Sequence, residues 1–265
     1  MVFNETFLRL EDSFARLRRF TADASPELRT PLTAIRSVGE VGMHESMDAA
    51  SCREVIGSML EETDRLTKLV DSLLTLSRAD AGNVPFSKQV IDLAALAVEV
   101  GECLQVLAEE KEQNLTVAAP APVFAEVDRA TLRQALINLL DNAIKYTPVG
   151  GKVQVTVGTT SGGEAALAVS DDGPGIAAEH REKIFERFYR VDEGRSREVG
   201  GAGLGLSIVK WAVESNGGRI ELDSVANGGS TFRIVFPLQT KDLPSSGKGE
   251  NFSRDLQEAP ANGPR

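Results

Sequence analysis

Two broad apolar stripes near the start of the chain constrain its fold more than any other feature. Between residues 28 and 76, apolar side chains recur every three or four positions, which predicts two α-helices joined by a turn at residues 44–51. The first stripe contains Leu28, Leu32, Ile35, Val38 and Val41. The second, broader stripe contains Val55, Ile56, Met59, Leu60, Leu66, Leu69, Val70, Leu73, Leu74 and Leu76. A single hairpin cannot bury stripes this broad, so we expect an all-α helical hairpin that pairs with a second copy as a dimeric four-helix bundle.

The hairpin is flanked by a shorter helical pattern and by a linker. Five apolar residues between Phe3 and Leu17 follow a 4-3-4-3 spacing, which predicts a coiled-coil-like helix over residues 1–22. An ordinary amphipathic core helix accounts for this spacing equally well. Gly82 follows the second stripe and predicts the end of its helix. We therefore place the hairpin at residues 23–84.

From residue 85 the pattern changes to a mixture of strands and helices. Strands are predicted at 115–117, 123–127, 153–157, 165–170, 219–222 and 231–236, and helices at 94–112, 129–146 and 204–216. Asp128 is a favourable N-cap for the second of these helices. The mixture predicts an α/β sandwich over residues 85–239, in which helices cover one face of a mixed sheet. Residues 240–265 are rich in small, polar and charged residues, so we expect a disordered tail.

Composition argues against several functions. A net charge of −10 lacks the basic footprint of a nucleic-acid-binding protein, so we expect no nucleic-acid partner. We also expect no transmembrane segment and no signal peptide in this chain, because no apolar run approaches the roughly 20 residues that span a bilayer. Cys52 and Cys103 lie in helical patterns without metal-ligand spacing, which predicts two buried, reduced thiols and a cytoplasmic location.

A distinctive box covers residues 20–35, at the start of the first predicted helix. It reads Phe-Thr-Ala-Asp-Ala-Ser-Pro-Glu-Leu-Arg-Thr-Pro-Leu-Thr-Ala-Ile. This box resembles the phosphoacceptor box of the sensor histidine kinases of two-component systems, F-x-x-D-x-S-H-E-L-R-T-P-L-T-x-I. Pro26 stands where that family has its phosphorylated histidine. The resemblance implies that Glu27 is a general base and that Thr30 orients the water that hydrolyses the phosphoaspartate of a response regulator receiver domain, while Arg29 completes the match.

The resemblance also places the chain within a longer protein. In the family, the helix before this box leaves a membrane-proximal relay module. Residues 1–22 would then be a signalling helix, and the chain would be the cytoplasmic part of a membrane sensor.

Pro26 is expected to change both the helix and the chemistry. Proline inside a helix removes one backbone hydrogen bond and clashes with the preceding turn, at a cost of about 3 kcal/mol, so we expect a kink or break near residues 24–26 and a second bend at Pro31. Proline offers no imidazole nitrogen as a nucleophile, so autophosphorylation at residue 26 is predicted to be lost. His44 would lie about 27 Å away along a continuous helix, and His180 is expected to be exposed, so neither replaces the missing acceptor.

Four motifs in the second domain carry side chains suited to a nucleotide. Asn138, Asn142 and Lys145 project from one helix face, where amide oxygens suit a magnesium ion and an ammonium group suits phosphate. Asp171 begins the second motif, Asp-Asp-Gly-Pro-Gly-Ile, and its carboxylate can accept the amine of adenine. The third and fourth motifs are Ile-Phe-Glu-Arg-Phe-Tyr-Arg at residues 184–190 and the glycine-rich residues 200–206, which open a helix with free N–H groups for phosphate. Each motif alone also fits an ordinary turn or helix face.

In this order the four motifs resemble the ATP-binding fold shared by histidine kinases, DNA gyrase, the Hsp90 chaperone and MutL, and no Walker P-loop occurs. The resemblance implies ATP and Mg²⁺ as cofactors. Asn138 would hold Mg²⁺, while Asn142 and Lys145 would contact phosphates. The adenine would meet Tyr146, Asp171, Gly173, Gly175 and Thr231. A lid over residues 177–203 would be anchored by Phe185 and Phe188, would bring Arg190 to the γ-phosphate, and would close through Gly201, Gly203, Leu204 and Gly205.

The resulting hypothesis is the core of a homodimeric sensor histidine kinase that binds ATP and Mg²⁺, serves a response regulator and has lost its acceptor histidine. Two alternatives remain open. The chain can be a catalytically silent nucleotide-binding scaffold, or a regulator with only phosphatase activity. An ATPase of the gyrase or chaperone type is disfavoured by the acceptor-like box.

Overall fold

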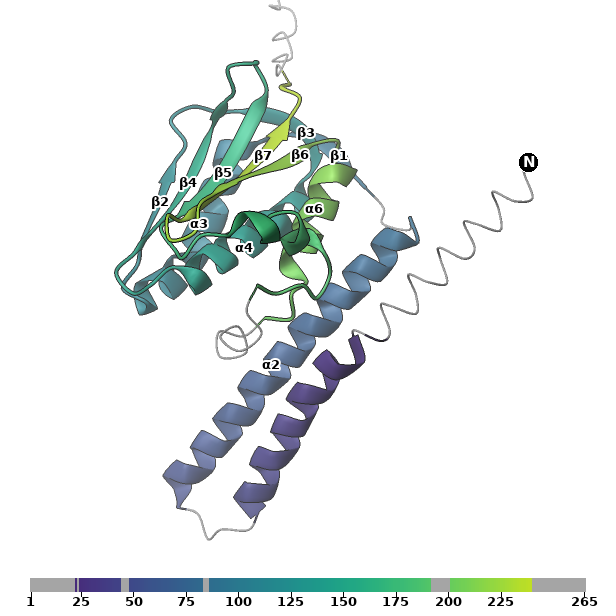
Figure 1. Cartoon of the computed structure of the whole chain (residues 1–265), viewed down its shortest axis with the longest axis vertical. Helices are drawn as coiled ribbons and strands as arrows, with labels where there is room; N and C mark the ends of the chain where they lie inside the picture. The colour runs from purple at the N-terminus through teal and green to yellow at the C-terminus, as the bar shows by residue number, and fades with distance from the viewer. Residues whose placement is uncertain (1–21, 23, 44–47, 83–85, 192–200, 240–265) are drawn as a thin grey trace, which may run out of the picture.

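The chain folds into a long helical hairpin with an α/β domain beside one end of it (Figure 1). The computed structural model describes residues 22, 24–43, 48–82, 86–191 and 201–239. The predictions for the signalling helix before residue 22, for His44 and the rest of the turn at residues 44–47, and for the tail after residue 239 lie outside these described residues.

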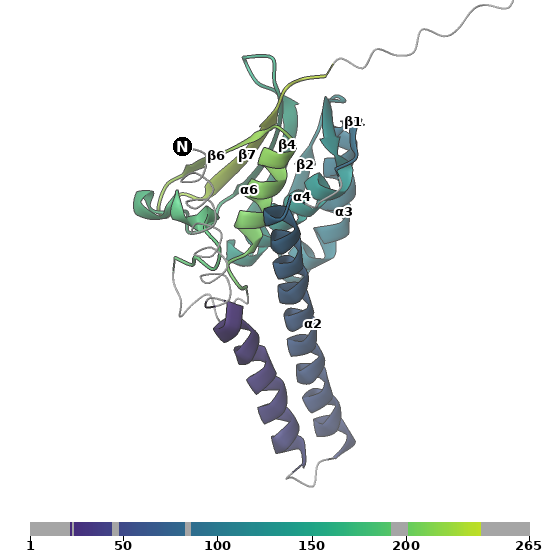
Figure 2. The same ribbon diagram turned by 90° about the vertical axis from the view of Figure 1, so that its right-hand side faces the viewer.

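Two antiparallel helices form the hairpin. They are a helix over residues 24–43, which we call the Pro26 helix, and α2 (Ala49–Asp80), and they lie side by side in both ribbon views (Figures 1 and 2). Asp48 caps α2, because its Oδ1 accepts a hydrogen bond from the Ser51 N–H at 2.8 Å. After α2, Gly82 has a φ of +64°, the left-handed conformation that glycine supplies at the end of a helix. The two predicted helices are confirmed.

The Pro26 helix is continuous, contrary to the prediction for its two prolines. Residues 24–43 are helical without interruption, so no break occurs at Pro26 or Pro31, and Figure 2 shows this helix as one unbroken ribbon. The prolines leave the carbonyls of Ala22 and Glu27 without their helical donors. Ala22 is exposed and Glu27 half-buried, so water can replace the lost donors. The direction of the chain before residue 24 lies outside the described residues, and a kink there stays a prediction.

Within its described residues, the α/β domain contains two sheets and three main helices. The larger sheet has five strands in the order β2-β4-β5-β7-β6, with β2 parallel to β4 and the other neighbours antiparallel. β1 pairs with β3 in a separate antiparallel ladder. The strands are β1 (Lys88–Asp92), β2 (Asn114–Ala118), β3 (Phe124–Asp128), β4 (Lys152–Thr159), β5 (Ala165–Asp171), β6 (Arg219–Ser224) and β7 (Ser230–Phe236). The helices are α3 (Leu93–Glu110), α4 (Arg129–Tyr146) and α6 (Gly205–Ser215), with two 3-10 turns, η1 (Ala178–His180) and η2 (Lys183–Phe185).

The three helices pack against one face of the larger sheet, which confirms the predicted α/β sandwich (Figure 1). The predicted strands at 115–117 and 123–127 are both present, but they belong to different sheets. Asp128 is the N-cap of α4, as predicted, and its Oδ1 accepts from the Thr131 N–H at 2.9 Å. Buried Asn216 connects the end of α6 to this cap, because its Oδ1 accepts from the Asp128 N–H at 2.6 Å.

Both cysteines are exposed, so the prediction of two buried thiols is wrong. In α3 the buried stripe runs through Val100, Leu104 and Ala108, and Cys103 lies outside it. Cys52 lies near the start of α2, where the buried residues Leu69 and Leu76 are far along the helix. Helical periodicity predicted the helices correctly, but it did not predict which face of each helix is covered.

A small apolar cluster joins the hairpin to the α/β domain. Its buried members are Leu69 and Leu76 of α2, with Leu204 and Ile208 at the start of α6. Partly buried residues pack against them: Leu28, Leu73, Phe188, Ala202 and Trp211. We call these nine residues the docking cluster. Nearby, the Arg187 guanidinium donates two hydrogen bonds to the Asp80 carboxylate, each at 2.7 Å. Figure 2 shows α6 beside the domain end of α2.

Candidate functional site

The four predicted nucleotide motifs meet around α4 and the start of α6. A Cβ built on Gly205 would lie 3.9 Å from the Cβ of Asn138, so the first and fourth motifs face each other. A Cβ on Gly173 would lie 3.2 Å from the carbonyl oxygen of Tyr146, so the second motif adjoins the end of α4. The fold therefore brings together residues that are up to about 70 positions apart.

Asn138 and Arg190 each hold a buried nitrogen atom that has no hydrogen-bond partner among the described residues: Nδ2 of Asn138 and Nη2 of Arg190. The Asn138 Oδ1 has a single distant contact, with Gln134 Nε2 at 3.5 Å. Buried donors without partners cost about 1–3 kcal/mol each, so they are rare in ordinary cores. Two such donors, one of them on Asn138 next to a glycine-rich helix start, are expected of a site that is completed by a polar ligand.

The other polar residues of α4 are accessible to a ligand. Asn142 and Lys145 are half-buried. Lys145 Nζ forms an ion pair with Asp141 at 2.6 Å, which neutralises its charge in this arrangement. Tyr146 is 48% exposed at the end of the helix, so its ring is free to pack on a flat ligand. Phosphate binding would require Lys145 to exchange the Asp141 carboxylate for a phosphate oxygen.

Two residues that sequence analysis did not identify hold the C-terminal end of α4. Lys111 Nζ donates to the carbonyl oxygens of Ile144 and Lys145, each at 2.8 Å. Buried Gln113 donates through Nε2 to the carbonyls of Ile144 at 3.0 Å and Thr147 at 2.7 Å. A cation at a helix C-terminus also balances the helix dipole. These partners lie 31 to 34 positions away in the sequence, so no local pattern identifies them.

Asp171 ends β5 and begins a loop over residues 171–176, which we call the Asp171 loop. Its Oδ1 accepts a hydrogen bond from the Gly173 N–H at 2.9 Å. Burial raises the pKa of the Asp171 carboxyl, although the backbone N–H groups of Gly173 and Ser230 partly oppose this. Asp172 differs, because its Oδ1 accepts from the Lys152 N–H at 2.8 Å and supports the sheet. Asp171 is thus the poorly hydrated carboxylate of the pair, suited to accept an amine donor.

The glycines of the Asp171 loop are required by close backbone packing. Gly175 has a φ of +64°, and a Cβ there would lie 1.9 Å from the carbonyl oxygen of Val225. A Cβ on Gly173 would lie 2.7 Å from Asp171 Oδ1. Any side chain at either position would displace the loop. Thr231, on β7, shares a hydroxyl contact with Ser170 at 2.9 Å and lies beside this loop in the sheet.

The middle of the predicted lid, at Phe188, meets its last residue, Gly203, next to α6. The Phe188 N–H donates to the carbonyl of Gly203 at 3.0 Å. Phe188 and Gly203 both have positive φ angles, +61° and +69°. Phe185 packs edge-on against Phe232, with ring centroids 6.3 Å apart. The described part of the predicted lid thus includes both of its predicted anchors, whereas residues 192–200 and their two glycines lie outside the described part of the chain.

Other lid residues depart from expectation or add little. His180 was expected to be exposed, but it is half-buried, and its Nδ1 lies 2.6 Å from the Tyr189 hydroxyl. A Cβ on Gly201 would have no atom within 4 Å among the described residues, so packing does not require glycine there. Leu204 is buried before α6 and makes no side-chain cap, which leaves the first N–H groups of α6 available to an anion.

Residues 24–35 of the acceptor-like box lie on the Pro26 helix, and several of their side chains are open to solvent. Pro26, Arg29 and Thr30 are exposed, and Glu27 is half-buried. The Thr30 hydroxyl donates to the carbonyl of Pro26 at 3.1 Å. Leu28 belongs to the docking cluster, which also contains Phe188 from the predicted lid and Leu204 just after it. The box therefore adjoins the base of the lid.

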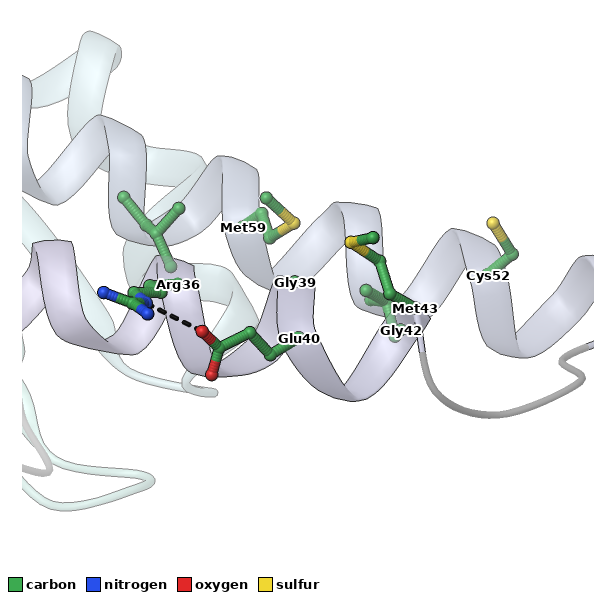
Figure 3. A pocket seen from close by; sticks show the side chains of 9 residues that line it. Arg36, Gly39, Glu40, Gly42, Met43, Cys52 and Met59 are labelled. Atoms are coloured by element: carbon green, nitrogen blue, oxygen red, sulfur yellow. Dashed lines mark hydrogen bonds and ion pairs between the residues drawn. The ribbon is translucent and has the colours of Figure 1, made fainter.

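A separate hollow of about 480 Å³ lies between the Pro26 helix and α2, at the end of the hairpin away from the domain (Figure 3). Apolar side chains dominate its lining, including Ile35, Met43, Val55 and Met59. An ion pair between Arg36 and Glu40, 2.7 Å long, lies at its edge (Figure 3). Such a lining suits apolar side chains and does not suit a triphosphate.

Comparison with known proteins gives matches over both parts of the chain. The HisKA model, His Kinase A (phospho-acceptor) domain, matches residues 16–82. The HATPase_c model, Histidine kinase-, DNA gyrase B-, and HSP90-like ATPase, matches residues 127–240. The chain is similar to the sensor protein IrlS of Burkholderia pseudomallei, with 36% identity over 235 residues, which is 89% of this chain and 50% of IrlS. It thus spans about half the length of this relative.

Solved structures agree with these matches. The mycobacterial sensor histidine kinase MprB is 31% identical, with a TM-score of 0.50, over 58% of this chain and 99% of that chain. Full-length ShkA in complex with AMPPNP is 29% identical, with a TM-score of 0.62, over 84% of this chain and 46% of that chain. Among the described residues, no helix is both long and apolar enough to cross a membrane.

Proposed function

Because this chain belongs to the sensor histidine kinases of two-component systems, we propose that it is a kinase core with a complete ATP site and no acceptor histidine. The chain carries the phosphoacceptor and ATPase domains of that family. The observation that carries the proposal is the pair of buried, unpartnered donors, Asn138 Nδ2 and Arg190 Nη2, of which Asn138 lies beside the glycine-rich start of α6. This feature also argues against a scaffold that does not bind nucleotide.

ATP would use the four motifs together. Asp171 would accept the amine of adenine, and Tyr146 would pack on the ring from the end of α4. Asn142 and Lys145 would contact phosphate oxygens, with Lys145 leaving Asp141. Arg190 would bind the γ-phosphate through its unpartnered nitrogen, and the free N–H groups at the start of α6 would bind phosphate as the lid closes.

A magnesium ion fits the residues around Asn138. Among the described residues, the Asn138 Oδ1 has one distant contact, and amide oxygens are ligands that Mg²⁺ accepts together with phosphate and water. When bound, the ion would neutralise negative charge on the phosphates. Asn138 would hold it from α4, and Gly205 leaves space opposite for it and the phosphates, because no side chain occupies that position.

Residue 26 would not accept the phosphoryl group. Transfer requires a nucleophilic imidazole nitrogen, and the nitrogen of Pro26 is part of an amide. Glu27, Arg29 and Thr30 would keep their family positions around an absent nucleophile. A phosphoryl group would therefore reach a response regulator only from another chain that has an intact acceptor.

The hairpin would form a homodimer through its exposed apolar face. Large apolar residues of the hairpin are 48–86% exposed in the single chain, namely Leu32, Val41, Met43, Ile56, Leu60 and Leu74. Exposed apolar surface on this scale favours an interface. The apolar hollow near Met43 and Met59 would receive side chains of the second hairpin (Figure 3).

The test restores the acceptor. The unaltered chain, Pro26→His, and Pro26→His combined with Asn138→Ala are incubated with Mg²⁺ and ATP labelled on the γ-phosphate. We expect acid-labile label only on Pro26→His, and its loss when Asn138 is also replaced. Label on the unaltered chain would contradict the lost-acceptor proposal. No label on any variant, together with no AMPPNP binding, would contradict the ATP site.

A further inference from the structure

A buried serine at the end of β6 holds the Asp171 loop. Ser224 is 3% exposed, and its Oγ accepts a hydrogen bond from the Ile176 N–H at 2.8 Å. The same Oγ donates to the carbonyl of Gly229 at 2.8 Å and lies 2.9 Å from the Ser230 Oγ. A hydroxyl has one proton and two acceptor sites, so Ser230 donates to Ser224. All the hydrogen-bonding capacity of Ser224 is therefore used.

Ser224 belongs to a row of residues that leads directly to Asp171. In the sheet, Asp171 on β5 is opposite Ser230 on β7, and Ser230 is opposite Ser224 on β6. The Ser230 backbone N–H also bonds the Asp171 carboxylate. Ser224 therefore contacts, through Ser230 and Ile176, both the first and the last residue of the Asp171 loop.

The turn between β6 and β7, residues 224–230, follows the Asp171 loop along its length. The Asn227 N–H donates to the carbonyl of Pro174 at 2.6 Å, and the Gly229 N–H donates to the carbonyl of Gly173 at 3.1 Å. A Cβ on Gly229 would lie 2.1 Å from the carbonyl oxygen of Asp171. The two segments thus pack backbone against backbone. The loop contains two glycines, so its shape depends on these outside contacts.

We propose that Ser224 is a positioning residue for nucleotide selection, which fixes the Asp171 loop so that the carboxylate favours an adenine over a guanine ring. The inference rests on the proposed function of Asp171 as the acceptor for the adenine amine. A guanine ring would place a carbonyl oxygen where adenine has its amine, so a fixed carboxylate would repel it. Selection of this kind requires an acceptor that cannot move away.

The experiment compares two nucleotides in three chains. Affinities for Mg²⁺–AMPPNP and Mg²⁺–GMPPNP are measured by calorimetry for the unaltered chain, for Ser224→Ala and for Thr160→Ala. Thr160 is the matched control, because its Oγ1 also accepts a backbone N–H in a strand-connecting turn of this sheet, from Glu164 at 3.1 Å, but at the opposite end of β5. Ser224→Ala is expected to weaken AMPPNP binding about tenfold and GMPPNP binding much less, while Thr160→Ala leaves the ratio unchanged.

The outcomes distinguish a Ser224 that positions the Asp171 carboxylate for nucleotide selection from a Ser224 that only stabilises the fold. An equal loss for both nucleotides, or an unchanged ratio in a folded Ser224→Ala chain, would overturn the inference while leaving the proposed ATP site intact. No AMPPNP binding by the unaltered chain would overturn both. If Ser224→Ala does not fold, Ser224→Cys keeps the shape of the residue but weakens the acceptor. Its AMPPNP to GMPPNP affinity ratio is expected to fall severalfold, and an unchanged ratio would again overturn the inference.

Discussion

The Pro26 helix and the Asp171 loop differ in how strongly their fold depends on the identity of one residue. Pro26 stands where the resemblance to the acceptor box places the phosphorylated histidine, yet the helix over residues 24–43 continues through it. Gly175 in the Asp171 loop faces the carbonyl of Val225 so closely that no other residue fits. A site whose reactive group projects into solvent can lose that group without loss of fold. A site built by backbone contacts cannot.

The largest effects are expected from two substitutions, one that destabilises the Asp171 loop and one that stabilises the Pro26 helix. Gly175→Ala would have to relieve both a φ of +64° and a 1.9 Å approach, so we expect a loss of about 3 kcal/mol or more in the free energy of unfolding of the α/β domain, together with loss of AMPPNP binding. Pro26→Ala removes a proline from a helix interior and is expected to stabilise the hairpin by up to about 3 kcal/mol. Chemical denaturation and calorimetry measure both.

Gly57→Ala is the control for the glycine substitution. Gly57 lies in α2 with no atom near a built Cβ, so alanine there is expected to stabilise the helix by about 1 kcal/mol. A Gly175→Ala chain that binds AMPPNP normally would show that the loop tolerates displacement. A Pro26→Ala chain that is less stable than the unaltered one would show that proline is favourable at that position.

The sequence predicts features that depend on neighbouring residues better than contacts between distant segments. The α4 bounds were predicted correctly because local signals coincide there, with Asp128 as the cap and a regular apolar stripe. The five-stranded sheet followed from alternation and turn residues. The contacts of Lys111, Gln113 and Ser224 were not predicted, because each joins segments that are adjacent only after folding.

Local rules also failed where tertiary context decides the outcome. Proline predicts a helix break from its own geometry, but solvent can satisfy the carbonyls that Pro26 and Pro31 leave free. The two cysteines were expected to be buried from residue type alone, and both are exposed. For the proposed nucleotide site, the candidate residues were selected from motif spacing, whereas the unpartnered nitrogens that support ligand binding are visible only in three dimensions.

A smaller effect is expected in the pH dependence of stability, which tests the environment of the Asp171 carboxyl. Burial raises the pKa of Asp171 above its reference value of 3.8, so the folded chain retains this proton to higher pH than the unfolded chain does. The stability from this proton is present below pH 3.8 and is lost as the pH rises through the folded pKa. Asp171→Asn has no titrating carboxyl at this position and does not lose stability in this way. The free energy of unfolding of Asp171→Asn, relative to that of the unaltered chain, should therefore increase from about pH 4 towards neutral pH. Denaturant midpoints over that range measure it.

Asp128 is the control, because its pKa is shifted in the opposite direction to that of Asp171. Burial acts to raise its pKa, but hydrogen bonds from the backbone N–H groups of Thr131 and Ser87 prevail and lower it. Its stabilising contribution is therefore present at neutral pH and is lost as the pH falls below 3.8. Asp128→Asn should thus be most destabilising at neutral pH. Parallel pH profiles for the two variants would show that the environment of Asp171 is not a poorly hydrated one.

The smallest expected effect concerns the contact between the hairpin and the domain. Arg187 and Asp80 form a two-bond ion pair, but their side chains are 32% and 50% exposed, so solvent screens the charges. A double-mutant cycle of Arg187→Ala and Asp80→Ala on thermal unfolding is expected to give a coupling of about 0.5 kcal/mol. Trp211, the single tryptophan, packs in the docking cluster, so its emission reports the same contact. Arg187→Ala is expected to shift this emission slightly towards that of a more exposed indole.

A second two-bond pair within the sheet serves as the control for that contact. Arg219 donates to both carboxylate oxygens of Glu164, at 2.6 and 2.7 Å, and neither residue belongs to the docking cluster. Arg219→Ala is expected to leave Trp211 emission unchanged. If Arg187→Ala also leaves it unchanged, the apolar residues Leu69, Leu76, Leu204 and Ile208 hold the two parts together without the ion pair, and the Pro26 helix stays beside the lid through packing alone.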